Sequence, residues 1–232
     1  MRRNLGLSER KENTRGPFHT DVVLFEPDEI LEHYNQSVCD IRSEFDVAES
    51  LLHDGKVAAA SYIWRSQVIF LFAAFDFFMH ELLKYGLFKI HDGSWEETEK
   101  YQNIQLRLKD LMLAIDQGCS SDWFLDYVNS LFAGQSMVRY AYVKEHLNLI
   151  GLDITEIAND AFFEKGGKEK PLDRMKTCLE GLYDRRNVIA HQLDRRHADA
   201  RQDEISEDLV HKFMSDLEKI VLAIFKIVKK RN

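Results

Sequence analysis

Turn-forming residues are scarce in this chain: its 232 residues include 3 prolines and 11 glycines. Sandwiches and barrels built from short strands need many tight turns, so this scarcity argues against them. Cysteine is also rare, and Cys39, Cys119 and Cys178 show no CxxC spacing. Neither a disulfide framework nor a cysteine-based zinc site is therefore supported. We expect long helices with few breaks.

Long apolar runs are missing as well. The longest runs from Val68 to Phe75, eight residues, whereas a membrane-spanning helix needs about 20. The first 17 residues are polar, without the apolar stretch of a secretory signal. We therefore expect a cytoplasmic protein with no membrane partner.

Composition predicts one globular domain, with 45% apolar and 30% charged residues. We assign residues 21–232 to this domain. Residues 1–20 are basic, have little apolar content, and are expected to form a mobile tail. The formal net charge of −8 disfavours a protein that coats nucleic acid, because phosphate binding needs a positive surface.

Apolar residues recur at spacings of three and four, which predicts helices, and no alternating strand pattern is present. The expected helices span about 27–52, 56–85, 94–118, 121–134, 137–150, 171–193 and 206–231. Gly86 is suited to a left-handed cap on the second helix. The centre of that helix, residues 68–79, is apolar around its whole circumference except for Asp76. We expect its aromatic residues to be core rather than a base-stacking platform, namely Phe70, Phe72, Phe75, Phe77 and Phe78.

The helix that begins at Pro171 places an arginine, Arg186, on its apolar stripe. The other members of this stripe are Leu172, Met175, Leu179, Leu182, Ile189 and Leu193. A charge at a core position costs several kcal/mol unless it is paired. We expect Asp76 to meet Arg186, or its neighbour Arg185, where the two helices cross. One interpretation is a purely structural ion pair in a helical scaffold.

A second interpretation is chemical. Asn187 and His191 lie one turn apart on the same face, with Tyr183 one turn earlier. An arginine, an amide and an imidazole can cleave RNA without a metal: the imidazole takes a proton from the ribose 2′-hydroxyl, and the arginine stabilises the phosphorane. Imidazole suits this task because its ordinary pKa lies near neutrality.

At these residues, Arg185-Arg186-Asn187-Val188-Ile189-Ala190-His191, the sequence resembles the Arg-x4–6-His signature of the HEPN superfamily. The resemblance covers roughly residues 30–230 and is closest to the bacterial RiboL-PSP-HEPN branch. It implies an all-α, up-and-down helical bundle of HEPN type with additional helices, and a two-fold dimer in which the motifs face one another. Arg139 and His146 match the same spacing but lack the asparagine.

Active HEPN members are metal-independent endoribonucleases, often in toxin–antitoxin or phage-defence systems with a partner protein. The resemblance thus implies Arg186 and His191 as the catalytic pair and Asn187 as an orienting group. Asp76, Arg185 and Tyr183 would support them, with no cofactor and no metal. Other members are non-catalytic nucleotide-binding, RNA-binding or assembly modules, which is the alternative interpretation.

The charge objection weakens when the chain is subdivided. Residues 164–201 contain ten bases and seven acids, so the strip around the motif is locally positive. Doubled in a dimer, this strip is positive enough to hold an RNA segment. The alternative interpretation is that Arg195, Arg196 and Arg201 only solvate a loop, and for each arginine taken singly this alternative is favoured. The candidate RNA-binding residues are Arg195, Arg196, His197 and Arg201. The histidines show no metal-ligand spacing such as HExxH.

Overall fold

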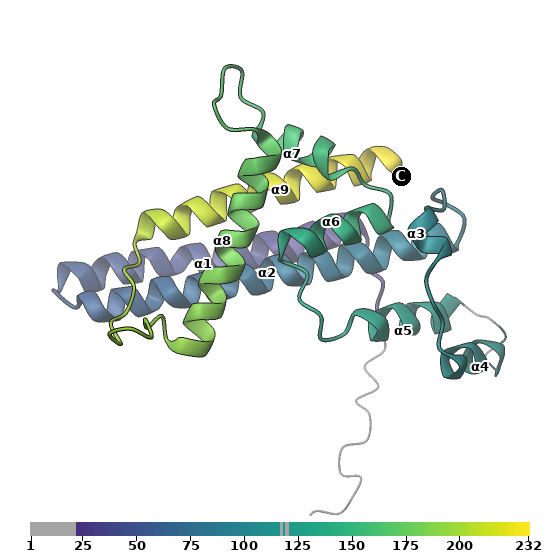
Figure 1. The fold of residues 1–232 in the computed structure, drawn as a ribbon, viewed down its shortest axis with the longest axis horizontal. Coiled ribbons are helices and arrows are strands. Elements are labelled where there is room, and N and C mark those ends of the chain that lie inside the picture. Colours follow the sequence, from purple (N-terminus) through teal and green to yellow (C-terminus); the bar gives the residue numbers. More distant parts are fainter. Residues whose placement is uncertain (1–21, 117, 119–120) are drawn as a thin grey trace, which may run out of the picture.

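The computed structural model describes residues 22–116, 118 and 121–232 (Figure 1). The predicted tail of residues 1–20 and Cys119 lie outside these residues. The described part is mostly helical and contains no strand, as an all-α fold requires. Its helices are α1 (Pro27–His53), α2 (Val57–His91), α3 (Glu99–Gln102), α4 (Leu108–Asp116), α5 (Ser121–Phe132), α6 (Tyr140–Leu149), α7 (Ile154–Phe162), α8 (Pro171–Gln192) and α9 (Glu207–Arg231).

The two longest helices, α1 and α2, form an antiparallel hairpin, and α9 packs against both (Figure 1). Helix α1 begins with Pro27 at its first position, where the Glu26 backbone N–H donates to the Glu29 carboxylate. The turn to α2 contains Gly55, whose positive φ of 75° suits glycine. Helix α9 begins after Ser206, which caps it: the Leu209 backbone N–H donates to Ser206 Oγ.

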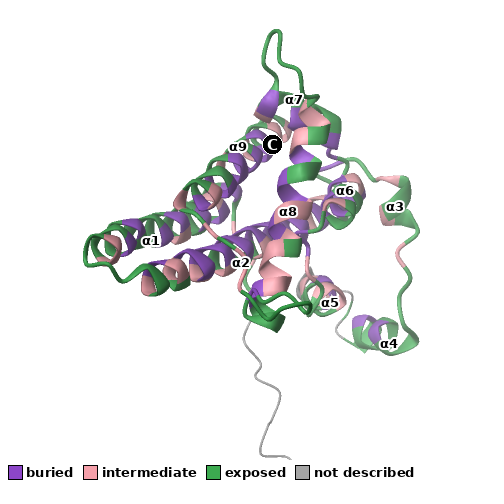
Figure 2. Ribbon diagram, turned by 60° about the vertical axis from the view of Figure 1, so that its left-hand side comes forward, coloured by how far each residue is buried: buried purple, intermediate pink, exposed green. Residues whose placement is uncertain are grey.

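The core lies where α1, α2, α8 and α9 meet, and these helices bury their inner faces there (Figure 2). Helix α8 crosses α2, and α7 packs on α8 and α9 (Figure 1). The crossing places the second half of α8 over the middle of α2. The side chains of the Arg-x4–6-His match, which lie in this half of α8, can therefore contact residues from the middle of α2.

By length and composition alone, α2 could cross a membrane. The longest uninterrupted apolar run, eight residues, did not indicate that α2 is long and apolar enough to cross a membrane. A few polar residues interrupt the apolar residues of this helix and keep each run short. Of its most apolar 18-residue window, 61% is buried inside the protein. A helix buried by its neighbours passes the same test as a membrane span, so its hydropathy is weak evidence for a membrane.

Three predictions about the helices are wrong: one expected helix is split, one ends too early, and α7 is missing from the expected set. The helix expected over 94–118 is split into α3 and α4, separated by residues 103–107. The apolar side chains of α4 are largely exposed, with Leu108 at 75%, because α4 packs mainly on the short α5 at one end of the molecule. Helix α2 does not end near Gly86 but continues to His91.

Gly86 is needed for close packing rather than for a cap. A Cβ at this position would lie 2.8 Å from Cγ2 and 2.9 Å from Cβ of Ile150. We expect Gly86→Ala to lower the free energy of unfolding by about 1–3 kcal/mol, because overpacking outweighs the better helix propensity of alanine. Urea denaturation measures this change.

Gly181, in the middle of α8, is the matched control, since a Cβ there meets Phe213 at an ordinary 3.5 Å. Gly181→Ala should be neutral or stabilising by up to about 1 kcal/mol. Adding Ile150→Ala to Gly86→Ala should cost less than the sum of the two single changes. Equal effects of the two glycine substitutions would contradict the close-packing role of Gly86.

Candidate functional site

Helix α8 carries the Arg-x4–6-His match, and its buried stripe anchors it to the core. Met175, Leu179, Leu182 and Ile189 are buried, as their spacing predicts. The stripe does not continue to Leu193, which is exposed: the helix ends at Gln192, and Leu193 adopts a left-handed φ of 50°. The exposed end of α8 therefore leads into residues 193–206, which connect it to α9.

Arg186 has an aromatic neighbour in place of the carboxylate that its position predicts. Its Cζ lies 4.4 Å from the centroid of the Phe72 ring of α2. Its Nη1 donates a hydrogen bond of 2.9 Å to Oδ1 of Asn187. A guanidinium over an aromatic face is attracted by the ring quadrupole, so Phe72 and Asn187 together fix the direction of this cation.

The predicted pairing of Asp76 with Arg186 or Arg185 is wrong. Asp76 Oδ1 accepts a 2.6 Å hydrogen bond from the backbone N–H of Met137, and the Ser136 hydroxyl lies 3.4 Å away. Asp76 thus holds the segment between α5 and α6 against α2. The structural scaffold based on an Asp76–Arg186 ion pair fails for the same reason.

A buried ionic cluster that the sequence did not reveal lies at the end of α8. Oδ2 of Asp194 accepts from Nε of Arg65 at 2.9 Å and from Nη2 of Arg185 at 2.6 Å. The side chains of Asp194 and Arg65 are 0% and 6% exposed. We call Arg65, Arg185 and Asp194 the α2–α8 clasp.

The clasp also orders the chain beyond α8. Arg65 Nη2 donates to the carbonyl of Asp203, and Arg185 Nη2 donates to that of Glu204. Asp194 itself has a left-handed φ of 61°, which turns the chain back toward α2. One carboxylate therefore ties α2, α8 and the connection to α9 together, within a few residues of the Arg-x4–6-His match.

His191 lies on the exposed surface in the last turn of α8, one turn after Asn187. Tyr183, one turn before Asn187, is half-buried and lies 6.3 Å from the Phe72 ring, centroid to centroid. Tyr183, Asn187 and His191 thus follow one face of α8, and the Arg186 guanidinium bends back to join them at Asn187. The face carries the half-buried amide of Asn187 and the exposed imidazole of His191, and the half-buried Arg186 cation donates to that amide.

Arg139, at the start of α6, is a neighbour of this face that the sequence did not place there. Its Cζ lies 5.7 Å from the centroid of the Tyr183 ring, and its Nε lies 3.4 Å from a Glu180 carboxylate oxygen. Arg139 and Arg186 thus flank the linked Tyr183 and Phe72 rings. In the sequence, Arg139 stands out only as part of the second Arg-x4–6-His match, Arg139 to His146. The structure does not bring these two residues together as a pair on one surface, because Arg139 is exposed whereas His146 is buried.

Burial lowers the pKa of His146 below its ordinary value. Between that lowered pKa and about 6.5, the unfolded chain binds a proton that the folded chain does not. We therefore expect the free energy of unfolding to fall as pH falls below about 6.5. Urea denaturation at several pH values measures the trend.

His146→Leu should reduce this loss, whereas His53→Leu, which changes an exposed histidine in the last turn of α1, should leave it unchanged. The pKa of His91 is also lowered by burial, so part of the pH dependence should persist in His146→Leu. An identical pH dependence in wild type and His146→Leu would show that His146 does not contribute.

Acidic neighbours neutralise part of the predicted basic strip. Arg196 pairs with Asp203, and Arg201 lies 3.9 Å from Asp199. Arg195 instead donates to the carbonyl of Ala200, so its charge is not paired in that contact. His197 is exposed beside them. Of the candidate RNA-binding residues, Arg195 and His197 keep most of their capacity for a phosphate.

Among the described residues, no group of three or more His, Cys, Asp or Glu side chains could hold a metal ion. Comparisons with protein-family models, with curated proteins and with solved structures found no match for the chain.

Proposed function

We propose that the chain is a metal-independent endoribonuclease of HEPN type. The observation that carries the proposal is the geometry of α8, where Phe72 and Asn187 hold the Arg186 guanidinium beside a face that ends in the exposed His191. The motif also lies in the penultimate helix, before a serine-capped last helix. The resemblance implies a cytoplasmic toxin–antitoxin or phage-defence setting, which is part of the proposal.

The reaction follows from these groups. His191 takes the proton of a ribose 2′-hydroxyl, and the 2′-oxygen attacks the adjacent phosphorus. Arg186 stabilises the charge that develops on the phosphoryl oxygens. The bond to the 5′-oxygen breaks, and that oxygen leaves with a proton. The products are a 2′,3′-cyclic phosphate and a 5′-hydroxyl.

A two-fold dimer is part of the proposal because one protomer offers one such imidazole. A second copy of α8 facing the first would supply a second imidazole to protonate the leaving 5′-oxygen. It would also double the local positive charge, which matters because two of the loop arginines already have acidic partners.

The neutralised loop arginines favour a second candidate, a non-catalytic HEPN-like RNA-binding or assembly module. Purified protein incubated with RNA in EDTA distinguishes the two. Cleavage that is lost in the Arg186→Ala/His191→Ala double variant supports the enzyme. RNA binding without cleavage supports the module, and undiminished cleavage by the double variant would refute this site.

A further inference from the structure

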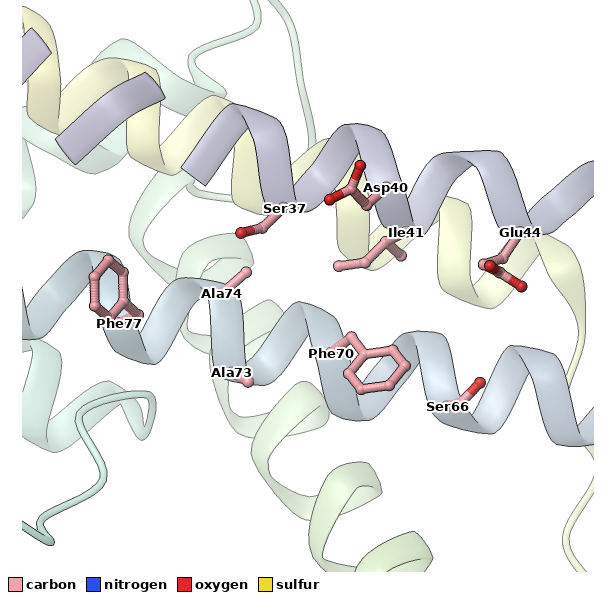
Figure 3. Close-up of a pocket in the computed structure, with 9 residues that line it drawn as sticks. All are labelled: Ser37, Asp40, Ile41, Glu44, Ser66, Phe70, Ala73, Ala74 and Phe77. Atoms are coloured by element: carbon pink, nitrogen blue, oxygen red, sulfur yellow. The ribbon is translucent and has the colours of Figure 1, made fainter. Parts of the chain in front are cut away.

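A groove lies between α1 and α2, away from the Arg-x4–6-His match (Figure 3). Its volume is about 530 Å³, and it is open to solvent. Residues from Ser66 to Phe77 line it on the α2 side, which corresponds to about 17 Å of helix. That length is about three helical turns.

Two aromatic side chains in the groove are exposed although the apolar pattern of α2 predicts that they are core. Phe70 is 55% and Phe77 is 45% exposed, whereas Phe72, Phe75 and Phe78 are buried. Phe70 and Phe77 are seven residues apart, so they lie on the same face of α2 (Figure 3). Contiguous exposed apolar surface of this kind marks a docking site.

The shape of the groove fits a helix. Ile41, Ala73 and Ala74 lie between the larger side chains, and two small alanines allow a third helix to approach the hairpin closely. Helix α9 packs on α1 and α2, and α8 crosses α2, but neither contributes a residue to the groove. A straight apolar groove between two helices is a common receptor for an amphipathic helix.

The charges along the groove select the kind of helix. Asp40 and Glu44 lie one turn apart on the α1 side, both exposed, and among the residues that the structure describes no lysine, arginine or histidine lines the groove. Asp40 accepts a hydrogen bond from the neutral Gln36 amide. The hydroxyls of Ser37 and Ser66 donate to backbone carbonyls of their own helices, so they do not donate to the two carboxylates.

A second copy of the same face is a poor occupant of the groove. It would bring its own Asp40 and Glu44 to the Asp40 and Glu44 of the first copy, and these like charges repel one another. We propose instead that the α1–α2 groove binds an amphipathic helix of a partner protein, with leucine-like residues on one face and lysine or arginine along the edge beside α1. Phe70 and Phe77 would pack between its apolar side chains. Asp40 and Glu44 would pair with its cations.

A labelled 16-residue Leu/Lys amphipathic peptide, and a Leu/Glu peptide of the same pattern, test the proposal by fluorescence polarisation at physiological salt. The Leu/Lys peptide should bind the full chain. Asp40→Lys/Glu44→Lys should weaken its binding by about tenfold or more and should create binding of the Leu/Glu peptide. Phe70→Ala/Phe77→Ala should weaken binding of the Leu/Lys peptide by a similar factor, about tenfold.

The matched control is Asp46→Lys, which changes an exposed α1 carboxylate outside the groove and should alter affinity by less than about twofold. Because the changed side chains are exposed, circular dichroism should show that all variants remain folded. Equal binding of the Leu/Lys peptide to wild type and Asp40→Lys/Glu44→Lys would overturn the proposal. So would a dimer in light scattering that Phe70→Ala/Phe77→Ala dissociates, since the occupant would then be a second copy.

Discussion

Arg186→Ala and His191→Ala are each expected to lower the rate of RNA cleavage by about 100-fold or more. Loss of a positioned general base costs about 10²–10⁴ in rate, and loss of a donor to a developing oxyanion costs about 10²–10³. Single-turnover cleavage of a labelled RNA in EDTA measures the chemical step. The double variant should be little slower than the worse single one, because the two groups act in one step.

Arg186→Lys sharpens this test. A lysine keeps the charge, but it lacks the planar guanidinium that stacks on Phe72 while it donates to Asn187. We expect Arg186→Lys to remain far below wild type. Arg42→Ala and His53→Ala change an exposed arginine and an exposed histidine of α1 and should retain full activity. Wild-type cleavage by Arg186→Ala would contradict the assigned role.

Asp194→Ala is expected to lower the free energy of unfolding by about 3–5 kcal/mol. Removing one partner of a buried ion pair leaves the other charge uncompensated, and the Arg65 side chain of α2 is only 6% exposed. Arg185 would lose a partner at the same time. Urea denaturation followed by circular dichroism measures the change.

The control for Asp194 is Asp160→Ala. Asp160 pairs with Lys226 at 2.9 Å, but both side chains are well exposed, so its loss should cost about 0–1 kcal/mol. Equal losses in the two variants would show that the α2–α8 clasp contributes no more than a surface pair. If the clasp has the expected strength, Asp194→Ala should also lower the rate of RNA cleavage, because Asp194 orders the chain next to His191.

The elements that local signals specify were predictable. Pro171 begins α8, Ser206 caps α9, and the three-four spacing places Met175, Leu179 and Leu182 in the core. These features depend on neighbours a few residues away, so the sequence contains them directly. The all-α class follows from the same signals.

The partners of the charged residues were not predictable, because they depend on which distant segments meet. Asp76 and Arg186 were each correctly seen as polar groups in apolar surroundings, yet each is satisfied by a different group, the Met137 backbone and the Phe72 ring. Asp194 follows the end of α8 and resembled an ordinary loop acid. Only the left-handed turn at Leu193 and Asp194 brings it under Arg65.

The exposed side of α2 was missed for a related reason. A helix that is apolar all round is expected to be surrounded, but the described helices cover only part of α2 and leave Phe70 and Phe77 exposed. The sequence shows how much of a helix is apolar. It does not show whether other helices of the same chain pack on that apolar surface. The uncovered side of α2, with Phe70 and Phe77, forms one wall of the α1–α2 groove.

Analysis of the RNA ends produced in EDTA tests the central claim most directly. Attack by the 2′-oxygen predicts fragments with 2′,3′-cyclic phosphate and 5′-hydroxyl ends, formed at an undiminished rate in EDTA and absent with Arg186→Ala/His191→Ala. Cleavage that EDTA abolishes, or fragments that carry 3′-hydroxyl and 5′-phosphate ends, would contradict a metal-independent site built on Arg186 and His191.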